Sequence, residues 1–180
     1  MAAARAEFAQ YGLAGARIDR IARVARASKE RLYAHFRDKE GLYREVVAAD
    51  RADFFRAVTL RAEAVPEFVG ELYDLASSRP EHLRMITWAQ LEGFALDEPR
   101  ADDGQPVFAH AVATIDAAQA TGHVDPFWEP AYLLTLLFGI ALAWAYWPDP
   151  RAATDDPAEI ARRRAAAVEA ATRLIAAIPA

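Results

Sequence analysis

The chain has 180 residues and a formal net charge of -5, and more than half of its residues are hydrophobic. The absence of cysteine excludes disulfides, thiolate zinc sites and cysteine nucleophiles, and it favours a reducing cytoplasm. Alanine, leucine, arginine and glutamate dominate, while the prolines and glycines lie almost entirely outside the long apolar stretches. This composition predicts an all-α fold.

Charge is distributed unevenly along the chain. Residues 1–60 carry 12 basic and 8 acidic side chains, a net +4, whereas residues 61–180 carry 9 and 18, a net -9. Within residues 17–39 there are 8 basic and 3 acidic side chains, a local excess of +5. Such an excess indicates a surface for nucleic-acid phosphates, with a solvated basic helix face as the alternative.

Apolar periodicity and capping residues predict about nine helices. The first covers residues 2–11 and ends where Gly12 can take a left-handed cap conformation. A second covers 18–25, and a third covers 29–36 after the N-cap Ser28. The others are expected at 39–61, 66–77, 81–96, 106–121 and 127–147, and at 157–178 after the capping pair Asp156 and Pro157.

The segment 131–147 has no charged residue but is shorter than a bilayer requires, so a doubly buried helix is expected and no membrane partner. A second subunit would cover its outer face. A homodimer is therefore predicted through the helices at about 127–147 and 157–178. Replacing Leu137 or Ala171 by arginine is expected to separate the two subunits.

Residues 18–36 predict two short helices joined by a tight turn, the second exposing basic and aromatic side chains, which is the arrangement that enters the DNA major groove. From Ile21 to Leu42 the chain reads IARVARASKERLYAHFRDKEGL, which closely resembles the DNA-binding domain of the TetR family of regulators. The matching positions are Ile21, Ala22, Ala25, Ser28, Leu32, Tyr33, His35, Phe36, Lys39, Glu40 and Leu42. The resemblance extends from residue 1 to about 45, and beyond that only the helical layout is similar.

This resemblance implies a helix-turn-helix DNA-binding domain at 1–45 and a ligand-binding and dimerisation domain at 46–180. It also implies a cytoplasmic transcriptional regulator, with a repressor as the favoured type. The protein would bind a palindromic operator as a homodimer and would be released from it by a small apolar or aromatic effector. Lys29, Glu30 and Tyr33 would face the groove, where Glu30 would either accept from cytosine or repel the DNA. The residues expected near phosphates are Arg17, Ser28, Arg31, Tyr33, His35 and Lys39.

Three features depart from the family pattern. Arg26 stands where the family usually has the turn glycine, so the turn is expected to be strained. Glu30 and Arg31 stand where small residues are common, which leaves the operator sequence unpredictable. The N-terminus lacks the usual basic arm and an additional helical turn, and a mis-assigned start would account for this.

Aromatic and aliphatic side chains beyond residue 80 are candidates for an apolar ligand cavity, with ordinary core packing as the alternative. The candidates are Trp88, Leu91, Phe94, Phe108, Ile115, Phe138 and Trp144, with Thr87, Gln90, His110 or Asp116 as polar partners.

No metal, cofactor or enzymatic activity is expected. His110, His123 and Asp125 match no metal-ligand spacing, and no histidine follows a glutamate by three residues as a di-iron bundle requires. A phosphate-binding glycine loop and a nucleophile elbow are also absent from the sequence. The rival to a DNA-binding regulator is a dimeric helical small-molecule-binding protein that has lost specific DNA binding.

Overall fold

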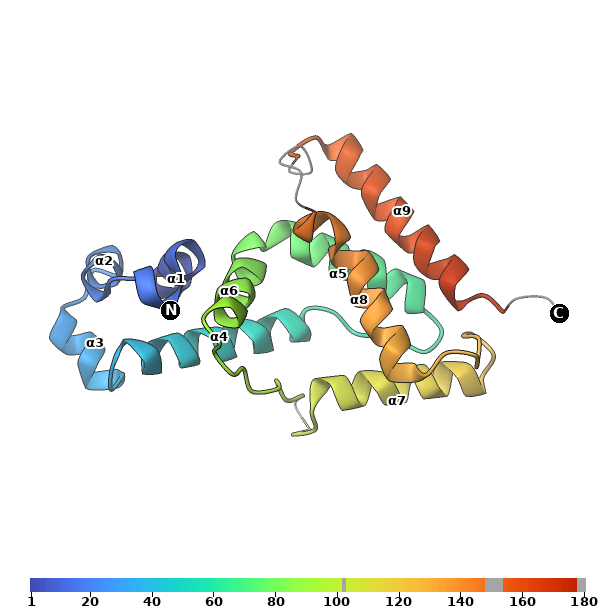
Figure 1. Cartoon of the computed structure of the whole chain (residues 1–180), viewed down its shortest axis with the longest axis horizontal. Helices are drawn as coiled ribbons and strands as arrows, with labels where there is room; N and C mark the ends of the chain where they lie inside the picture. The colour runs from blue at the N-terminus through green and yellow to red at the C-terminus, as the bar shows by residue number, and fades with distance from the viewer. Residues whose placement is uncertain (102, 148–153, 178–180) are drawn as a thin grey trace. The chain divides into compact units, whose positions relative to one another are not determined.

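The computed structural model describes residues 1–101, 103–147 and 154–177, and these residues form nine α-helices and no β-strand (Figure 1). The helices are α1 (Ala2–Gly15), α2 (Ile18–Val24), α3 (Lys29–His35), α4 (Lys39–Arg56), α5 (Val65–Ser78), α6 (Pro80–Leu91), α7 (Val107–Ala120), α8 (Pro130–Tyr146) and α9 (Pro157–Ile175). The predicted all-α fold is confirmed. No helix within the described ranges is both long and apolar enough to cross a membrane.

Two helices end earlier than their apolar patterns predict. α4 ends at Arg56 instead of residue 61, and α6 ends at Leu91 instead of residue 96. Gly93 explains the second difference, because its φ of +66° is unfavourable for other residues and closes the helix. The N–H of Phe94 then donates to the carbonyl of Ala89 at 2.8 Å.

Spatial contacts divide the chain into two compact units. The first unit holds Met1–Phe54 and Arg79–Pro99, and the second holds Phe55–Ser78 and Arg100–Ala180. Helices α1, α2, α3 and α6 and nearly all of α4 therefore belong to the first unit. The second unit contains α5, α7, α8 and α9.

Tyr43 lies at the centre of the first unit's core. Its ring is fully buried and meets Phe8 and Phe94 edge to face, with centroids 4.9 and 5.1 Å apart. The Tyr43 hydroxyl donates to the Met85 carbonyl at 3.2 Å, so it remains satisfied inside the core. Leu32, predicted to face inward from the third helix, packs against this cluster.

A bend at Gly12 joins α1 to the end of α6. Gly12 has a φ of +64°, and a Cβ there would come within 2.8 Å of the Trp88 ring. The next two backbone N–H groups, from Leu13 and Ala14, donate to the Glu92 carboxylate at 2.9 and 2.8 Å. Gly12 thus ends the first straight segment as predicted, and Glu92 caps the turn of helix that follows.

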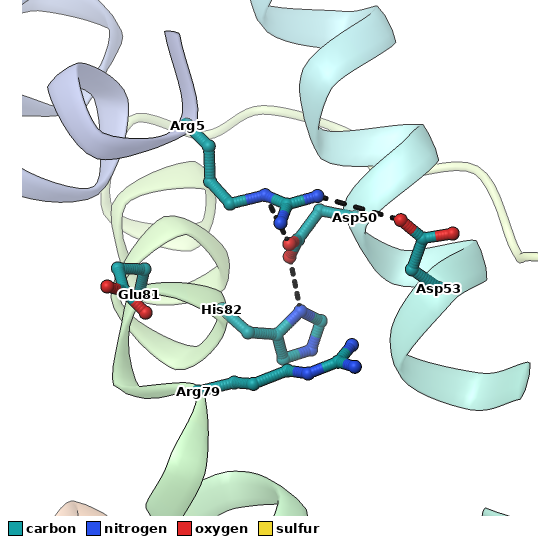
Figure 2. A pocket seen from close by; sticks show the side chains of 6 residues that line it. All are labelled: Arg5, Asp50, Asp53, Arg79, Glu81 and His82. Carbon is teal, nitrogen blue, oxygen red and sulfur yellow. Dashed lines mark hydrogen bonds and ion pairs between the residues drawn. The ribbon is translucent and has the colours of Figure 1, made fainter. Parts of the chain in front are cut away.

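A buried polar cluster joins α1, α4 and α6 within the first unit (Figure 2). Asp50 and His82 are each about 95% buried, and His82 Nδ1 lies 2.5 Å from Asp50 Oδ2. Arg5 Nε lies 2.8 Å from the other carboxylate oxygen of Asp50, as an ion pair without the alignment of a hydrogen bond. The His82 ring stacks on Phe54 at 3.8 Å. The adjoining pocket encloses about 380 Å³ and is lined by Arg5, Asp50, Asp53, Arg79, Glu81 and His82.

In the second unit, α5 packs against both α8 and α9. The side chains of Ala167 and Ala171 on α9 are completely buried, which permits close approach between helices. Arg164 Nε donates to Asp74 Oδ2 at 2.7 Å and so pairs α9 with α5. Part of the alanine-rich stripe of α9 is therefore used inside the protomer.

One face of α8 is left uncovered. The helix begins at Pro130, not at residue 127, because the Glu129 side chain caps it by accepting from the N–H of Tyr132 at 2.9 Å. Leu133 and Leu137 are fully buried, but Tyr132 and Leu136 remain 70% and 42% exposed. The exposed face repeats every three or four residues, at Tyr132, Leu136, Gly139, Ala143 and Tyr146.

The substitutions expected to separate a dimer were placed at the wrong residues. Leu137 and Ala171 have no exposed surface, because both pack inside the second unit of a single protomer. An arginine at either position would disrupt that unit's own core. Residue 178, the predicted end of the ninth helix, lies outside the described residues.

Candidate nucleic-acid interface

Helix α3 carries its side chains on the surface of the first unit. α2 buries Ile18, Ile21 and Ala22, whereas α3 has no fully buried residue. Its first turn is fixed by Ser28, whose hydroxyl accepts from the N–H of Arg31 at 3.2 Å, so the predicted N-cap is confirmed. Leu32 is half-buried and anchors the helix, which leaves the remaining positions open to a partner.

The predicted groove-facing residues are all exposed. Lys29, Glu30 and Tyr33 project from α3, and Tyr33 keeps 49% of its surface accessible. His35 at the end of the helix is also exposed and lies edge-on to Phe36, with ring centroids 6.4 Å apart. This arrangement provides the single exposed helix face that recognition in a major groove requires.

The turn between α2 and α3 places Arg26 in the left-handed region. Its φ is +52°, and it is the only non-glycine residue with a positive φ in the described part of the chain. The N–H of Arg26 donates to Arg23 and the N–H of Ala27 donates to Ala22, at 3.2 and 3.0 Å. This pair of hydrogen bonds is the Schellman closure of a helix, in which glycine normally occupies the position of Arg26. The expected strain at this turn is confirmed.

Three basic residues of this region are already bound within the protein. Arg20 Nε donates to Glu7 at 2.7 Å, and its guanidinium lies 4.1 Å from the Tyr11 ring centroid. Lys29 Nζ lies 2.5 Å from Asp19 Oδ1. Lys39 Nζ donates to two carbonyls at the end of α1, each at 3.2 Å. Lys39, expected near phosphates, is thus half-buried and occupied in this conformation.

Five guanidinium groups remain available around α3. Each is exposed, and none has an ion pair or side-chain hydrogen bond with any residue that the structure describes. They belong to Arg17, Arg23, Arg26, Arg31 and Arg37. The sequence prediction included Arg17 and Arg31 but missed the other three. Their exposed basic character was visible in the sequence, but which cations have internal partners depends on the fold.

Glu30 introduces a negative charge into this surface. Hydrogen bonds from its own backbone N–H and from the Ser28 hydroxyl, and the nearby Lys29, hold the pKa of the Glu30 carboxyl below its ordinary value. Glu30 is therefore ionised at neutral pH. An ionised carboxylate can only accept, so among base edges it fits the cytosine amino group.

The predicted ligand-binding residues fall into both units. Trp88, Leu91 and Phe94 belong to the first unit, where Leu91 is 74% exposed and Phe94 packs on Tyr43. Arg44 lies 4.2 Å from the Phe94 ring centroid. Phe108, Ile115, Phe138 and Trp144 belong to the second unit.

Phe108 and Phe138 lie in an aromatic cluster of the second unit. Phe55 lies 5.2 Å from Phe108 and 6.2 Å from Phe138, and Phe68 lies 5.9 Å from Phe138, measured between ring centroids. Sequence reasoning missed Phe55 and Phe68. Phe54 and Phe55 are consecutive on α4, so their side chains point about 100° apart. Two adjacent aromatic residues indicate that α4 is covered on more than one side, and this was the signal for Phe55.

The remaining second-unit candidates do not join this cluster by any ring contact of the described residues. The Trp144 ring meets Tyr73 at 5.7 Å, and Ile115 is fully buried. His110 and Asp116, considered as polar partners for a ligand, are exposed on α7.

Family models match both parts of the chain. Residues 1–46 match the model of bacterial regulatory proteins of the tetR family, and residues 64–173 match the model of the tetracyclin repressor-like C-terminal domain. These matches cover most of the chain, and the protein belongs to the TetR family of transcriptional regulators.

Individual relatives agree with this assignment. The HTH-type transcriptional repressor SCO4008 of Streptomyces coelicolor is 34% identical over 143 residues, covering 79% of this chain and 74% of that protein. The solved structure of SCO4942 from Streptomyces coelicolor is 40% identical, with a TM-score of 0.83 over 96% of this chain and 94% of that one. A TetR variant of Acinetobacter baumannii in complex with minocycline is similar in fold, with 16% identity and a TM-score of 0.52 over 97% of this chain and 90% of that one. The protein is thus a DNA-binding transcriptional regulator.

Proposed function

We propose that the protein is a cytoplasmic repressor that binds a palindromic operator as a homodimer and dissociates from it when a small apolar or aromatic effector binds. Residues 1–45 form the DNA-binding domain in this proposal, and residues 46–180 form the effector and dimerisation domain. The observation that supports it best is a set of five guanidinium groups around the exposed helix α3 that have no partner among the residues that the structure describes. Cations held at a surface without internal partners suit an external polyanion.

On the operator, α3 enters the major groove. Lys29 donates to guanine O6 or N7, Glu30 accepts from cytosine N4, and Tyr33 contacts the base edges or the adjacent backbone. Arg17, Arg31 and His35 contact phosphates on either side of the groove and set the register of α3. Ser28 contributes by capping α3, and Lys39 by fixing the end of α1 through two carbonyls.

The homodimer forms through the outer faces of α8 and α9. The exposed apolar face of α8 has a spacing that suits packing against another helix. Ala158, Ala161 and Ala165 are exposed on α9 and permit close approach of a partner helix. Two-fold pairing of these helices would produce a four-helix interface and two reading helices, matching a palindromic operator.

The effector binds among the aromatic rings of the second unit. Phe108, Phe138 and Phe55 provide apolar surface with edge-to-face geometry, which suits a planar or aliphatic ligand. Phe55 is part of α4, the helix that begins at Lys39 next to the DNA-binding motif. An effector that prefers one arrangement of α4 lowers operator affinity by its differential affinity for the two states. The minocycline complex of the Acinetobacter baumannii TetR variant supports an aromatic ligand class.

Selection from a random double-stranded DNA pool, followed by sequencing, tests this function. We expect an enriched palindrome, and loss of that enrichment when Lys29 and Tyr33 are both replaced by alanine. Arg84→Ala is the matched control, because Arg84 is an exposed arginine on α6 outside the DNA-binding motif. If the wild-type protein enriches no sequence, the second candidate applies, a dimeric small-molecule-binding protein without an operator.

A further inference from the structure

The turn between α2 and α3 has a conformation that its own residue disfavours. Arg26 occupies the left-handed position of a Schellman closure with a φ of +52°. A side chain with a Cβ is strained there, and glycine is the residue that fits without strain. The hydrogen bonds of the closure come from backbone groups, so a glycine would make them equally well.

No contact of the Arg26 side chain within the described ranges compensates for this strain. Arg26 is exposed, and its guanidinium has no ion pair or hydrogen bond with any described residue. Asp19, the single acidic residue of α2, is paired with Lys29 at 2.5 Å. The Arg26 side chain therefore makes no polar contact with the described residues that would stabilise the free protein. Strained residues of this kind are concentrated at binding and catalytic sites, where the compensating contact is made with a partner.

The position of Arg26 suggests what that partner is. Arg26 lies two residues before the N-cap of α3, between the helix that crosses the DNA backbone and the helix that enters the groove. Exposed guanidinium groups flank it on both sides, from Arg23 and Arg31. A guanidinium is a planar fork that matches two phosphate oxygens, and it stays charged at any physiological pH.

We infer that Arg26 is a phosphate-binding residue that fixes the helix-turn-helix on the DNA backbone, and that its strain is retained for this contact. This inference depends on the proposed operator binding. The predicted phosphate contacts then include a residue of the turn itself. The family pattern has a glycine at this position, and a glycine has no side chain that could bind a phosphate.

Two substitutions separate charge from strain. Arg26→Gly removes both, so we expect the melting temperature to rise by about 2 °C while operator affinity falls about tenfold. Arg26→Gln keeps the strain and removes the charge, so the melting temperature should stay within about 1 °C of wild type while affinity falls to the same extent. For both variants, the slope of log K against log salt should fall by about 1.8 for the homodimer, because each subunit loses one phosphate contact and each contact contributes about 0.9. Opposite changes in stability and affinity cannot come from misfolding.

Fluorescence anisotropy with the selected operator and with a scrambled duplex, across a salt series, provides the measurement. Arg84→Gln is the control that removes the same charge from α6, and its slope should equal that of wild type. The inference is overturned if either Arg26 variant keeps the wild-type slope and affinity. If wild-type protein binds no duplex at all, the proposed function itself fails, which is a different result from a normal wild type with silent Arg26 variants.

Discussion

Asp19 in the first turn of α2 holds the ammonium group of Lys29 in the first turn of α3, with 2.5 Å between Oδ1 and Nζ. Both side chains are substantially exposed, so the pair stabilises the fold by only about 0.2–1 kcal/mol. We expect the pair to have its larger effect on the proposed DNA contact of Lys29. To reach a guanine, Lys29 must separate from Asp19. If the pair stays together, the carboxylate of Asp19 approaches the groove as a second negative charge beside that of Glu30.

Asp19→Asn should therefore raise affinity for non-specific DNA while reducing discrimination. Free Lys29 adds a cation to the surface of each subunit, so the salt slope of the homodimer should steepen by about 1.8, or about 0.9 for each subunit. The ratio of operator to non-specific affinity should fall, because an unrestrained ammonium contacts phosphates as readily as bases. Anisotropy titrations with operator and scrambled duplexes measure both quantities. Glu45→Gln on α4 is the control for net charge, and an unchanged specificity ratio in Asp19→Asn would show that Asp19 does not restrain Lys29.

The exposed face of α8 predicts where the proposed homodimer can be broken. Leu136→Arg places a charge at the centre of this face without touching the core of the protomer, since Leu136 is already 42% exposed. Burying that charge in an interface should cost about 3 kcal/mol or more, which raises the dimer dissociation constant at least about a hundredfold. Sedimentation velocity at micromolar concentration should then show monomers with wild-type helical content by circular dichroism.

Ala113→Arg provides the matched control for the dimer test, because Ala113 is exposed on α7 and outside the α8 face. This control should sediment like the wild-type protein. If Leu136→Arg remains dimeric, the subunits pair through another surface. If both variants dissociate, the effect is not specific to α8.

Parts of the fold could be predicted from local chemistry alone. Ser28 and Asp156 cap their helices as expected, because an N-cap acts within three residues of itself. The end of α6 was predicted wrongly at residue 96, although Gly93, which closes the helix, lies inside that predicted range. The end of α4 at Arg56 has no glycine or proline to mark it, and there tertiary packing decides.

The partners of the charged and polar side chains could not be predicted, because they depend on contacts between separate helices. Glu92 reaches Leu13 and Ala14 across 79 and 78 positions of sequence, and no local pattern relates them. The same holds for Asp50 and His82, 32 positions apart. Sequence reasoning identified the exposed residues of α3, but which basic side chains around it have partners within the described residues is a property of the folded chain.

The Asp50–His82 cluster predicts a local requirement for stability. Asp50→Ala leaves the buried Nδ1 of His82 without its partner, which should cost roughly 1–3 kcal/mol. Arg5 is about one-third exposed and can turn toward water, so its lost pairing adds little. Urea unfolding at neutral pH measures the loss. Asp53→Ala is the control, because its carboxylate is about half exposed and lies 3.6 Å from Arg5, and it should change stability by less than about 1 kcal/mol. Equal losses in the two variants would contradict a special role for the buried pair.

Tyr43 predicts how stability changes in alkaline solution. Burial, and secondarily the negative charge of Glu92, raise the pKa of Tyr43 from 10.0 to about 12 in the folded protein. The unfolded chain ionises near pH 10 while the folded protein holds its proton, so the contribution is fully present below pH 10 and is lost as pH rises toward 12. A shift of this size corresponds to roughly 3 kcal/mol.

Tyr43→Phe isolates this effect from the other groups that titrate in the same range. The variant should lose about 1 kcal/mol at pH 8 with the hydrogen bond to the Met85 carbonyl, but keep the ring contacts with Phe8 and Phe94. Unfolding free energies of both proteins, measured from pH 8 to 11.5, should converge above pH 10 and then cross, because only the wild type loses the tyrosine contribution and that loss exceeds the difference at pH 8. Parallel curves over the whole range would mean that the Tyr43 hydroxyl ionises as freely in the folded protein as in the unfolded chain.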